Sequence, residues 1–203
     1  MPMIDSSPAV LALWAVIGYG LGSIPFGLIL TRAFGLGDLR EIGSGNIGAT
    51  NVLRTGSKST AAATLVLDGA KGAVAVLLAR ALGGEAAAQV AALAAFLGHC
   101  YPIWLEFKGG KGVATFLGLM LALSWPVGLL SCATWLAAAA ISRISSLSAL
   151  VAALWSLLWC LLLGKGEIFF LTLVLVGLIM WRHRANIKRL RAGTEPRIGG
   201  SKA

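Results

Sequence analysis

Long apolar runs constrain this chain more than any other feature of its sequence. Hydrophobic residues make up 58% of the 203 residues and charged residues only 12%, which is not the composition of a soluble surface. A helix needs about 20 apolar residues to cross a bilayer, because backbone polar groups cannot stay unpaired in lipid. Six runs reach or approach that length: 8–31, 59–80, 86–105, 113–142, 147–163 and 167–182. We therefore predict an all-α, polytopic integral membrane protein.

The fourth run, 113–142, is too long for a single ordinary span. As one helix it would extend about 45 Å, whereas the hydrocarbon core is about 30 Å thick. Ser124, Trp125 and Pro126 stand near its middle, and a proline removes a helical hydrogen bond. The run is therefore predicted to form two short spans joined by a tight turn, which gives seven transmembrane helices with short loops.

The distribution of basic residues supports seven spans independently. The first ten residues contain no Lys or Arg, so the first run lacks the basic segment of a cleavable signal peptide and is predicted to stay as a span with the N-terminus outside. Only Arg80 and Lys165 then lie outside, and Lys71 lies within a span. The cytoplasmic segments hold the other 14: Arg32, Arg40, Arg54, Lys58, Lys108, Lys111, Arg143, Arg182, Arg184, Lys188, Arg189, Arg191, Arg197 and Lys202. Because basic residues accumulate in cytoplasmic loops, we predict a cytoplasmic C-terminus.

The net charge of +9 does not indicate a nucleic-acid partner. Basic residues cluster between apolar runs and form no stripe interleaved with aromatic residues, so they record orientation in a membrane. Cys100, Cys132 and Cys160 are an odd number, and all three lie within the apolar runs, so neither a disulfide framework nor a metal site follows. We predict no cofactor and no metal, and make no prediction of oligomeric state.

The first polar segment, within 40–58, has the composition of an anion site. It begins REIGSGNIGATNVLR, and its glycines allow successive backbone N–H groups to turn toward one point. Guanidinium groups at both ends suit a phosphate. The glycines alone would favour a turn that lets helices pack closely, but the added polar side chains favour an anion site. The candidates here are Arg40, Gly43, Ser44, Gly45, Asn46, Gly48, Thr50, Asn51 and Arg54.

Residues 43–48 also match the dinucleotide-binding pattern GxGxxG, and Asp68 follows about 20 residues later. That pattern works only between a strand and a helix in a βαβ unit. Here both flanks are predicted membrane spans, so we do not expect NAD binding.

The second polar segment, 98–115, reads GHCYPIWLEFKGGKGVAT. Gly109, Gly110, Lys111 and Gly112 lead directly into the fourth run, and a glycine-rich entry to a helix N-terminus is a second phosphate site. The segment is not a Walker A loop, since the required Gly and Ser or Thr are absent. His99 alone would more often be an interfacial histidine bonded to a carbonyl. It does not begin an HxxxxD acyltransferase motif, because position 104 is Trp.

The third segment, 181–199, contains His183 and Asn186, which share a helix face at i and i+3. Its basic residues could equally serve orientation and anchoring to anionic lipid. Asp68 and Lys71 have the same spacing inside the second run, where an isolated charge is costly, so we predict that they pair. Whether that pair only locks helices together or borders the site stays open.

The three segments together resemble one family, the bacterial acyl-phosphate-dependent glycerol-3-phosphate acyltransferases called PlsY. The strings that carry the resemblance are REIGSGNIGATNVLR, GHCYPIWLEFKGGKGVAT and HRANIKRLRAGTE, and it extends over essentially the whole chain. The resemblance implies a single domain, 1–203, in the bacterial cytoplasmic (inner) membrane, with the active site facing the cytoplasm. It assigns functional roles to Ser44, Arg54, His99, Lys111, His183 and Asn186 and to the loop 109–112, and a structural role to Glu195.

The implied reaction transfers a fatty acyl group from acyl phosphate to the 1-hydroxyl of sn-glycerol 3-phosphate. The products are 1-acylglycerol 3-phosphate and inorganic phosphate. The resemblance also implies that membrane lipids surround the spans. We expect direct attack on the acyl carbonyl, with Lys111, Arg54 and the amides of 109–112 stabilising the departing phosphate. Either a histidine or a substrate phosphate oxygen takes the proton.

Two other classes of function stay open from the residues alone. An organic-phosphate transporter would also need cationic, glycine-rich sites, but near the bilayer midplane rather than at one face. A lipid-binding scaffold would use only the basic tail. The polar groups here gather at the predicted cytoplasmic face, which favours an enzyme that meets a soluble substrate there.

Overall fold

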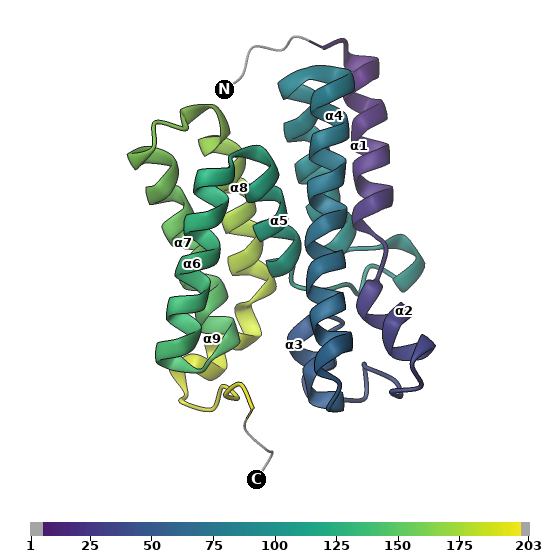
Figure 1. Cartoon of the computed structure of the whole chain (residues 1–203), viewed down its shortest axis with the longest axis vertical. Coiled ribbons are helices and arrows are strands. Elements are labelled where there is room, and N and C mark those ends of the chain that lie inside the picture. Colours follow the sequence, from purple (N-terminus) through teal and green to yellow (C-terminus); the bar gives the residue numbers. More distant parts are fainter. Residues whose placement is uncertain (1–5, 200–203) are drawn as a thin grey trace.

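The computed structural model describes residues 6–199 and is helical throughout, with no strand in that range (Figure 1). Two short 3-10 helices, Leu53–Thr55 and Ile103–Leu105, lie in the loops. The α-helices in chain order are α1 (Pro8–Gly22), α2 (Phe26–Ala33), α3 (Ala49–Val52), α4 (Lys58–Cys100), α5 (Val113–Leu123), α6 (Trp125–Ser142), α7 (Ser145–Leu162), α8 (Gly166–Arg182) and α9 (Arg184–Arg191). The all-α prediction is confirmed for the described residues.

Length and composition allow four helical stretches to cross a membrane: Pro8–Ala33, Lys58–Leu105, Trp125–Ser142 and Ser145–Leu162. A fifth is reached if α8 and α9, bent by 62° at His183, count as one broken span. α5 has only 11 residues, about 16 Å of helix, which is about half the hydrocarbon core. The protein is thus built from apolar, membrane-spanning helices, while the count of seven spans stays a prediction.

α4 is two helices joined at a glycine. Gly84 has φ 79° and ψ −175°, which is not helical, and Figure 1 shows α4 folding back at its upper end. We call residues 58–83 the first arm of α4 and residues 85–100 the second arm. The break falls between the predicted runs 59–80 and 86–105, so the sequence located it correctly.

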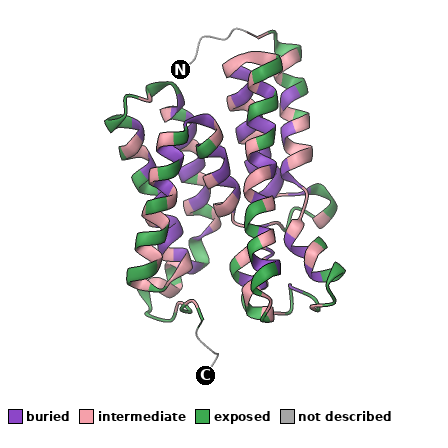
Figure 2. Cartoon of the chain, viewed as in Figure 1, coloured by how far each residue is buried: buried purple, intermediate pink, exposed green. Residues whose placement is uncertain are grey.

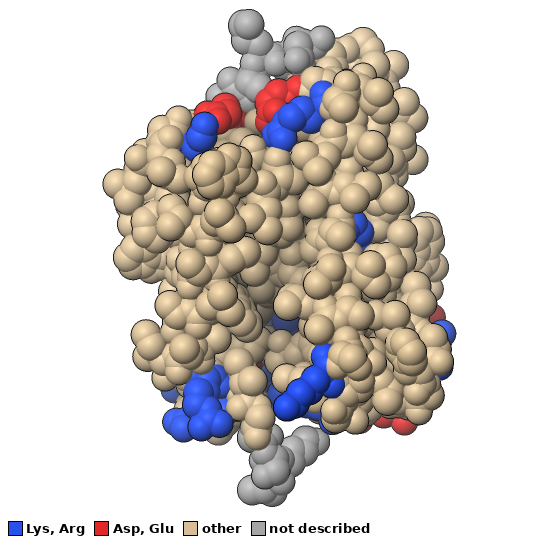
Figure 3. Space-filling model, viewed as in Figure 1, with Lys and Arg blue, Asp and Glu red and all other residues tan. Residues whose placement is uncertain are grey.

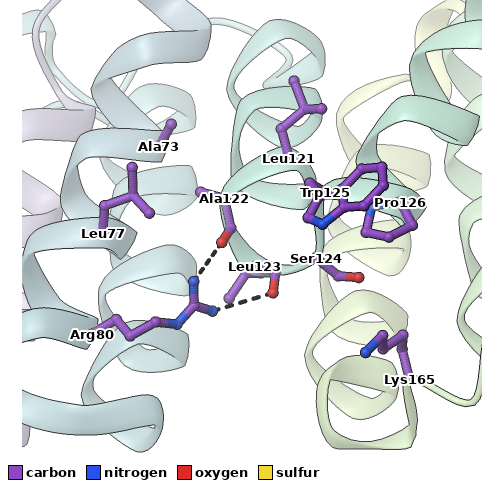
Figure 4. Close-up of a pocket in the computed structure, with 10 residues that line it drawn as sticks. All are labelled: Ala73, Leu77, Arg80, Leu121, Ala122, Leu123, Ser124, Trp125, Pro126 and Lys165. Atoms are coloured by element: carbon purple, nitrogen blue, oxygen red, sulfur yellow. Dashed lines mark hydrogen bonds between the residues drawn. The ribbon is translucent and has the colours of Figure 1, made fainter.

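The predicted interruption of the run 113–142 is confirmed. α5 ends at Leu123, Ser124 is extended with φ −153° and ψ 99°, and α6 starts at Trp125. Arg80 donates to the carbonyl oxygens of Ala122 and Leu123 at 2.5 and 3.2 Å (Figure 4). A helix end leaves such carbonyls without helical partners, so this arginine caps the broken end of α5. The residues drawn in Figure 4 line a pocket of about 530 Å³.

Helices cross closely where small residues face each other. A Cβ on Gly22 would lie 2.0 Å from the Ala95 carbonyl oxygen, and a Cβ on Gly118 would lie 2.1 Å from that of Gly69. Contacts of this kind are typical of membrane proteins, in which small residues allow transmembrane helices to pack closely. Buried residues face neighbouring helices, whereas exposed ones lie outward (Figure 2). Large outward side chains such as Ile141, 87% exposed, are apolar, as lipid contact requires.

The two ends of the molecule differ in charge. Within the described residues, α1 starts near one end and α9 lies at the other, which we call the C-terminal end (Figure 1). Figure 3 shows Lys and Arg gathered at the C-terminal end, with some acidic residues at its margin, whereas basic and acidic residues lie side by side at the other end. At that second end, Arg80 pairs with Glu85 at 2.7 Å and Lys165 lies 4.0 Å from Glu167.

Candidate active site

The first segment is organised around the side chain of Asn51, which is buried. Its Nδ2 donates to the carbonyl oxygens of Leu39 and Ile42, both at 2.9 Å. Its Oδ1 accepts from the Ser44 backbone N–H at 3.1 Å and from Arg54 Nη1 at 3.1 Å. One amide therefore ties together a loop that has little regular structure of its own.

Gly43 is required by this arrangement. It has φ 56°, and a Cβ there would lie 2.6 Å from Arg54 Cδ and 2.7 Å from Asn51 Oδ1. A larger residue would be strained and would push the arginine away. The sequence predicted that the glycines of this segment let the backbone turn, and the positive φ of Gly43 agrees with that.

The remaining first-segment candidates lie on or near the surface of the same loop. Ser44, Arg54 and Thr50 are exposed, and Thr50 Oγ1 lies 3.0 Å from Ser145 Oγ at the start of α7. Arg40 is exposed, and its backbone N–H donates to Asp38 at 2.9 Å. Three further candidates are half-buried in the loop: Gly45, Asn46 and Gly48.

The first two residues of the glycine loop, residues 109–112, form backbone hydrogen bonds with the end of α4. The Gly109 N–H donates to Cys100 O at 3.2 Å, and the Gly110 N–H donates to His99 O at 3.0 Å. These two amides are therefore taken, and the expectation that all four amides of the loop face an anion is wrong for them. Free N–H groups begin with the first turn of α5, as at any helix N-terminus.

Arg182, at the end of α8, holds this loop from the other side. Its Nη2 donates to Gly109 O at 3.0 Å and its Nε to Gly110 O at 3.1 Å. Its guanidinium also stacks over the Tyr101 ring, 4.9 Å from the centroid. The sequence showed Arg182 only as one of many basic residues after the last span, so no local signal marked this contact.

Lys111, in the second segment, interacts electrostatically with charged groups of the other two segments. It is half-buried, and burial is the main cause that lowers its pKa to about 8. The charged groups that act on it come from the first and third segments: Glu195, Arg189, Arg182 and Arg54. The carboxylate raises the pKa of Lys111, whereas the three guanidinium groups lower it. A cation held among other cations is a strong attractor for a multivalent anion.

His183 and Asn186 are both buried at the bend between α8 and α9. His183 Nδ1 lies 2.9 Å from Ile179 O, so this nitrogen carries the proton and Nε2 is left as an acceptor. Asn186 donates to Glu195, while its own Oδ1 is buried and has no hydrogen-bond partner in residues 6–199. An unpaired buried acceptor is costly unless a ligand supplies the donor.

Glu195 connects the tail to α7. It accepts from Ser146 Oγ at 2.6 Å and from Arg189 Nε at 2.7 Å, in addition to Asn186. Burial raises the pKa of Glu195, but these hydrogen bonds outweigh that effect and hold the pKa below its usual value. Ser146 and its neighbour Ser145 were not among the predicted residues, because nothing in the sequence distinguishes them from other serines at a helix start.

His99 lies apart from the polar surface. It is 4% exposed, and its Nδ1 lies 2.9 Å from Lys71 Nζ. The predicted pair is present, with Lys71 Nζ 2.7 Å from Asp68 Oδ1. Within residues 6–199, no group of three His, Cys, Asp or Glu side chains is arranged to hold a metal ion.

Charged groups of the first and third segments thus lie within electrostatic range of Lys111 in the second segment. The sequence model of the glycerol-3-phosphate acyltransferases matches residues 12–193. The chain belongs to the glycerol-3-phosphate acyltransferase family. A family member from Ruegeria pomeroyi is 70% identical over 203 residues, which is 100% of each chain. A member from Cereibacter sphaeroides is 66% identical over 199 residues, covering 98% of this chain and 95% of the relative.

Solved structures agree with this membership. The crystal structure of PlsY (YgiH), an integral membrane glycerol 3-phosphate acyltransferase, in its glycerol 3-phosphate form matches with a TM-score of 0.88 and 39% identity. That match covers 93% of this chain and 96% of the other. The lysophosphatidic acid form matches with a TM-score of 0.87 and 38% identity, covering 93% and 95%. The resemblance to the PlsY family is confirmed, and so is the integral membrane fold.

Proposed function

We propose that this protein transfers a fatty acyl group from acyl phosphate to the 1-hydroxyl of sn-glycerol 3-phosphate. The products are 1-acylglycerol 3-phosphate (lysophosphatidate) and inorganic phosphate, which makes this the first acylation step of bacterial phospholipid synthesis. Family membership supports an acyltransferase that acts on glycerol 3-phosphate. Crystal structures of the related PlsY include a glycerol 3-phosphate form and a lysophosphatidic acid form.

The observation that carries the proposal is the environment of Lys111. It stands beside the start of α5, within electrostatic range of Arg54, Arg182 and Arg189. Both proposed substrates bear phosphate, and one product is free phosphate, so several cations and a helix N-terminus suit every stage of the reaction. Apolar helices on either side suit the acyl chain.

In the proposed step, the glycerol hydroxyl oxygen attacks the acyl carbonyl carbon and the bond from that carbon to the phosphate oxygen breaks. Lys111, Arg54 and the first N–H groups of α5 stabilise the charge on the departing phosphate. Ser44 and Asn186 orient glycerol 3-phosphate, and Asn186 Oδ1 accepts a hydrogen bond from one of the hydroxyl groups of this substrate. The other first-segment candidates shape the loop that binds phosphate.

The hydroxyl proton passes either to His183 Nε2 or to a phosphate oxygen. Replacing His183 by Gln distinguishes these routes, because Gln keeps a polar group there but is not basic. Near-normal kcat with a raised KM for glycerol 3-phosphate would identify the phosphate as acceptor of the proton. Loss of kcat at an unchanged KM would identify His183.

We also propose seven spans in the bacterial cytoplasmic membrane, with the N-terminus outside and the site at the cytoplasmic face. In that arrangement both arms of α4 cross the membrane and α5 is a short span that ends at Leu123. The basic C-terminal end in Figure 3 is then cytoplasmic, as the preference of Lys and Arg for that side requires.

One assay tests the reaction. Purified protein in detergent or lipid is given glycerol 3-phosphate with acyl phosphate, and in parallel with acyl-CoA, and lysophosphatidate is measured. We expect product with acyl phosphate and little or none with acyl-CoA. Product from acyl-CoA alone would refute the proposed donor, and no product from either donor would refute the proposed activity.

A further inference from the structure

The ammonium of Lys71 is completely coordinated inside the protein. Its Nζ lies 2.7 Å from Asp68 Oδ1, 2.8 Å from Ile24 O and 2.9 Å from His99 Nδ1. It also lies 5.8 Å from the centre of the Phe26 ring. An ammonium has three N–H donors, so three acceptors use all of them. Lys71 is 5% exposed, and none of these contacts depends on solvent.

This coordination fixes the protonation of His99. An ammonium cannot accept a hydrogen bond, so His99 Nδ1 must be the acceptor and the ring proton must be on Nε2. The Nε2 side of the ring lies against the glycine loop, where a Cβ on Gly110 would be 2.1 Å from Nε2. The basic nitrogen of His99 is therefore engaged by Lys71, and the other nitrogen already carries a proton.

The same residues hold the start of the glycine loop. The carbonyl of His99 accepts the Gly110 N–H at 3.0 Å, while its ring fills the space beside Gly110. The carbonyl of Asp68 accepts from Thr115 Oγ1, in the first turn of α5, at 2.9 Å. Lys71 in the first arm of α4 thus contacts His99 in the second arm and Ile24 between α1 and α2. These contacts lie next to the glycine loop that carries Lys111.

We propose that the buried cluster Asp68–Lys71–His99 positions the glycine loop and its Lys111 for catalysis, and that His99 is a positioning residue rather than a general base. This inference rests on the proposed acyltransferase function. It removes His99 from the set of candidate catalytic residues and gives a role to the ion pair, which the proposed reaction does not otherwise use.

Two substitutions of His99 separate positioning from base catalysis. His99→Asn places an amide oxygen as many bonds from Cβ as Nδ1, so it still accepts from Lys71, but it is not basic. His99→Leu removes the acceptor and keeps an apolar volume. We expect His99→Asn to keep most of the wild-type kcat and His99→Leu to lose about 100-fold, the cost of a small misplacement of a catalytic group. Equal inactivity of the two variants would overturn the proposal.

The pH profile supplies a readout that loss of folded protein alone does not change. Wild-type kcat/KM should fall above pH about 8 as Lys111 loses its proton. If His99→Leu releases the loop, Lys111 becomes more solvated and this alkaline limb moves to higher pH, whereas it stays in place in His99→Asn. A limb that stays near pH 8 in His99→Leu would overturn the proposal.

The neutral double variant Asp68→Asn with Lys71→Met provides a second test that leaves no unpaired buried charge. We expect it to keep its detergent-solubilised fold, measured by thermal unfolding, yet to show a raised KM for acyl phosphate, a reduced kcat and the same shifted limb. Wild-type-like kinetics in this variant would overturn the positioning role. Failure of the wild-type protein to form lysophosphatidate would instead refute the proposed function.

Discussion

At the scale of single residues, Lys111 shows how burial adapts a common side chain to a site. A solvated lysine would be fully charged at neutral pH and surrounded by water. Burial and neighbouring guanidinium groups lower the pKa of Lys111 to about 8. The ammonium is therefore less hydrated than that of an exposed lysine, and it loses its proton at a lower pH. A poorly hydrated cation interacts more strongly with a phosphate that enters the site.

The first prediction is an alkaline limit to activity. Below pH about 8 the ammonium of Lys111 is present, and above it the neutral amine accumulates, so kcat/KM for acyl phosphate should fall as pH rises through 8. Lys111→Arg keeps its charge throughout this range and should lose the limb, although at lower overall activity because its geometry differs. Initial rates between pH 6 and 10 check this, and an unchanged limb in Lys111→Arg would contradict it.

At the scale of elements, the glycine loop is held between two helices by backbone groups. α4 accepts the N–H groups of Gly109 and Gly110, and Arg182 of α8 donates to their carbonyls. A loop with little side-chain volume has few other ways to hold one conformation. The contacts come from opposite directions, so each helix limits the movement that the other would allow.

The second prediction concerns this clamp. Arg182→Leu removes both hydrogen bonds to the loop and should lower kcat/KM by about 100-fold, the cost of misplacing Lys111. Arg182→Lys should recover little, because a single ammonium cannot reproduce a planar fork that reaches two carbonyls. Arg184→Leu is the matched control, since Arg184 stacks on Trp181 and is exposed. Equal losses at both positions would show that only positive charge matters here.

The third prediction concerns the crossing of the first arm of α4 with α5. A Cβ on Gly118 would lie 2.1 Å from Gly69 O, whereas Gly177 in α8 has open space within 4 Å. Gly118→Ala should therefore separate the two helices and destabilise the fold by about 1–3 kcal/mol. Gly177→Ala should have little effect. Thermal unfolding in detergent measures both, and equal stability of the two variants would contradict the proposed close packing.

At the scale of the whole molecule, charge and chain direction agree. Within the described residues, the start of α1 and the segment after α9 lie at opposite ends of the structure, and basic residues gather at the end where α9 lies (Figures 1 and 3). The proposed seven spans, an odd number, would produce this arrangement, and the proposed orientation places the basic end in the cytoplasm. In this proposed arrangement the site meets soluble substrate at the cytoplasmic face and lipid at its sides.

The fourth prediction tests this topology. In sealed right-side-out vesicles, a membrane-impermeant thiol reagent should label Lys165→Cys at once and Lys188→Cys only after detergent. Replacing Cys132 by Ser lowers the background, because the other two cysteines are buried. Labelling of Lys188→Cys in sealed vesicles would place the basic tail outside and contradict the proposed orientation.

The sequence alone determined the helical membrane class, the break at Ser124 and the three polar segments, together with the pairing of Asp68 with Lys71. These follow from apolar length, backbone chemistry and the cost of charge in lipid, all of which act along the chain. Such features are local, and local features can be read from residue order.

Only the tertiary structure decided which groups meet. The contact of Arg182 with the glycine loop joins residues more than 70 positions apart, and Glu195 reaches Ser146 across 49 positions. It also assigned two amides of the loop to α4 and enclosed His99 beside Lys71. No periodicity encodes such contacts, because they depend on how helices pack after the chain has crossed the membrane several times.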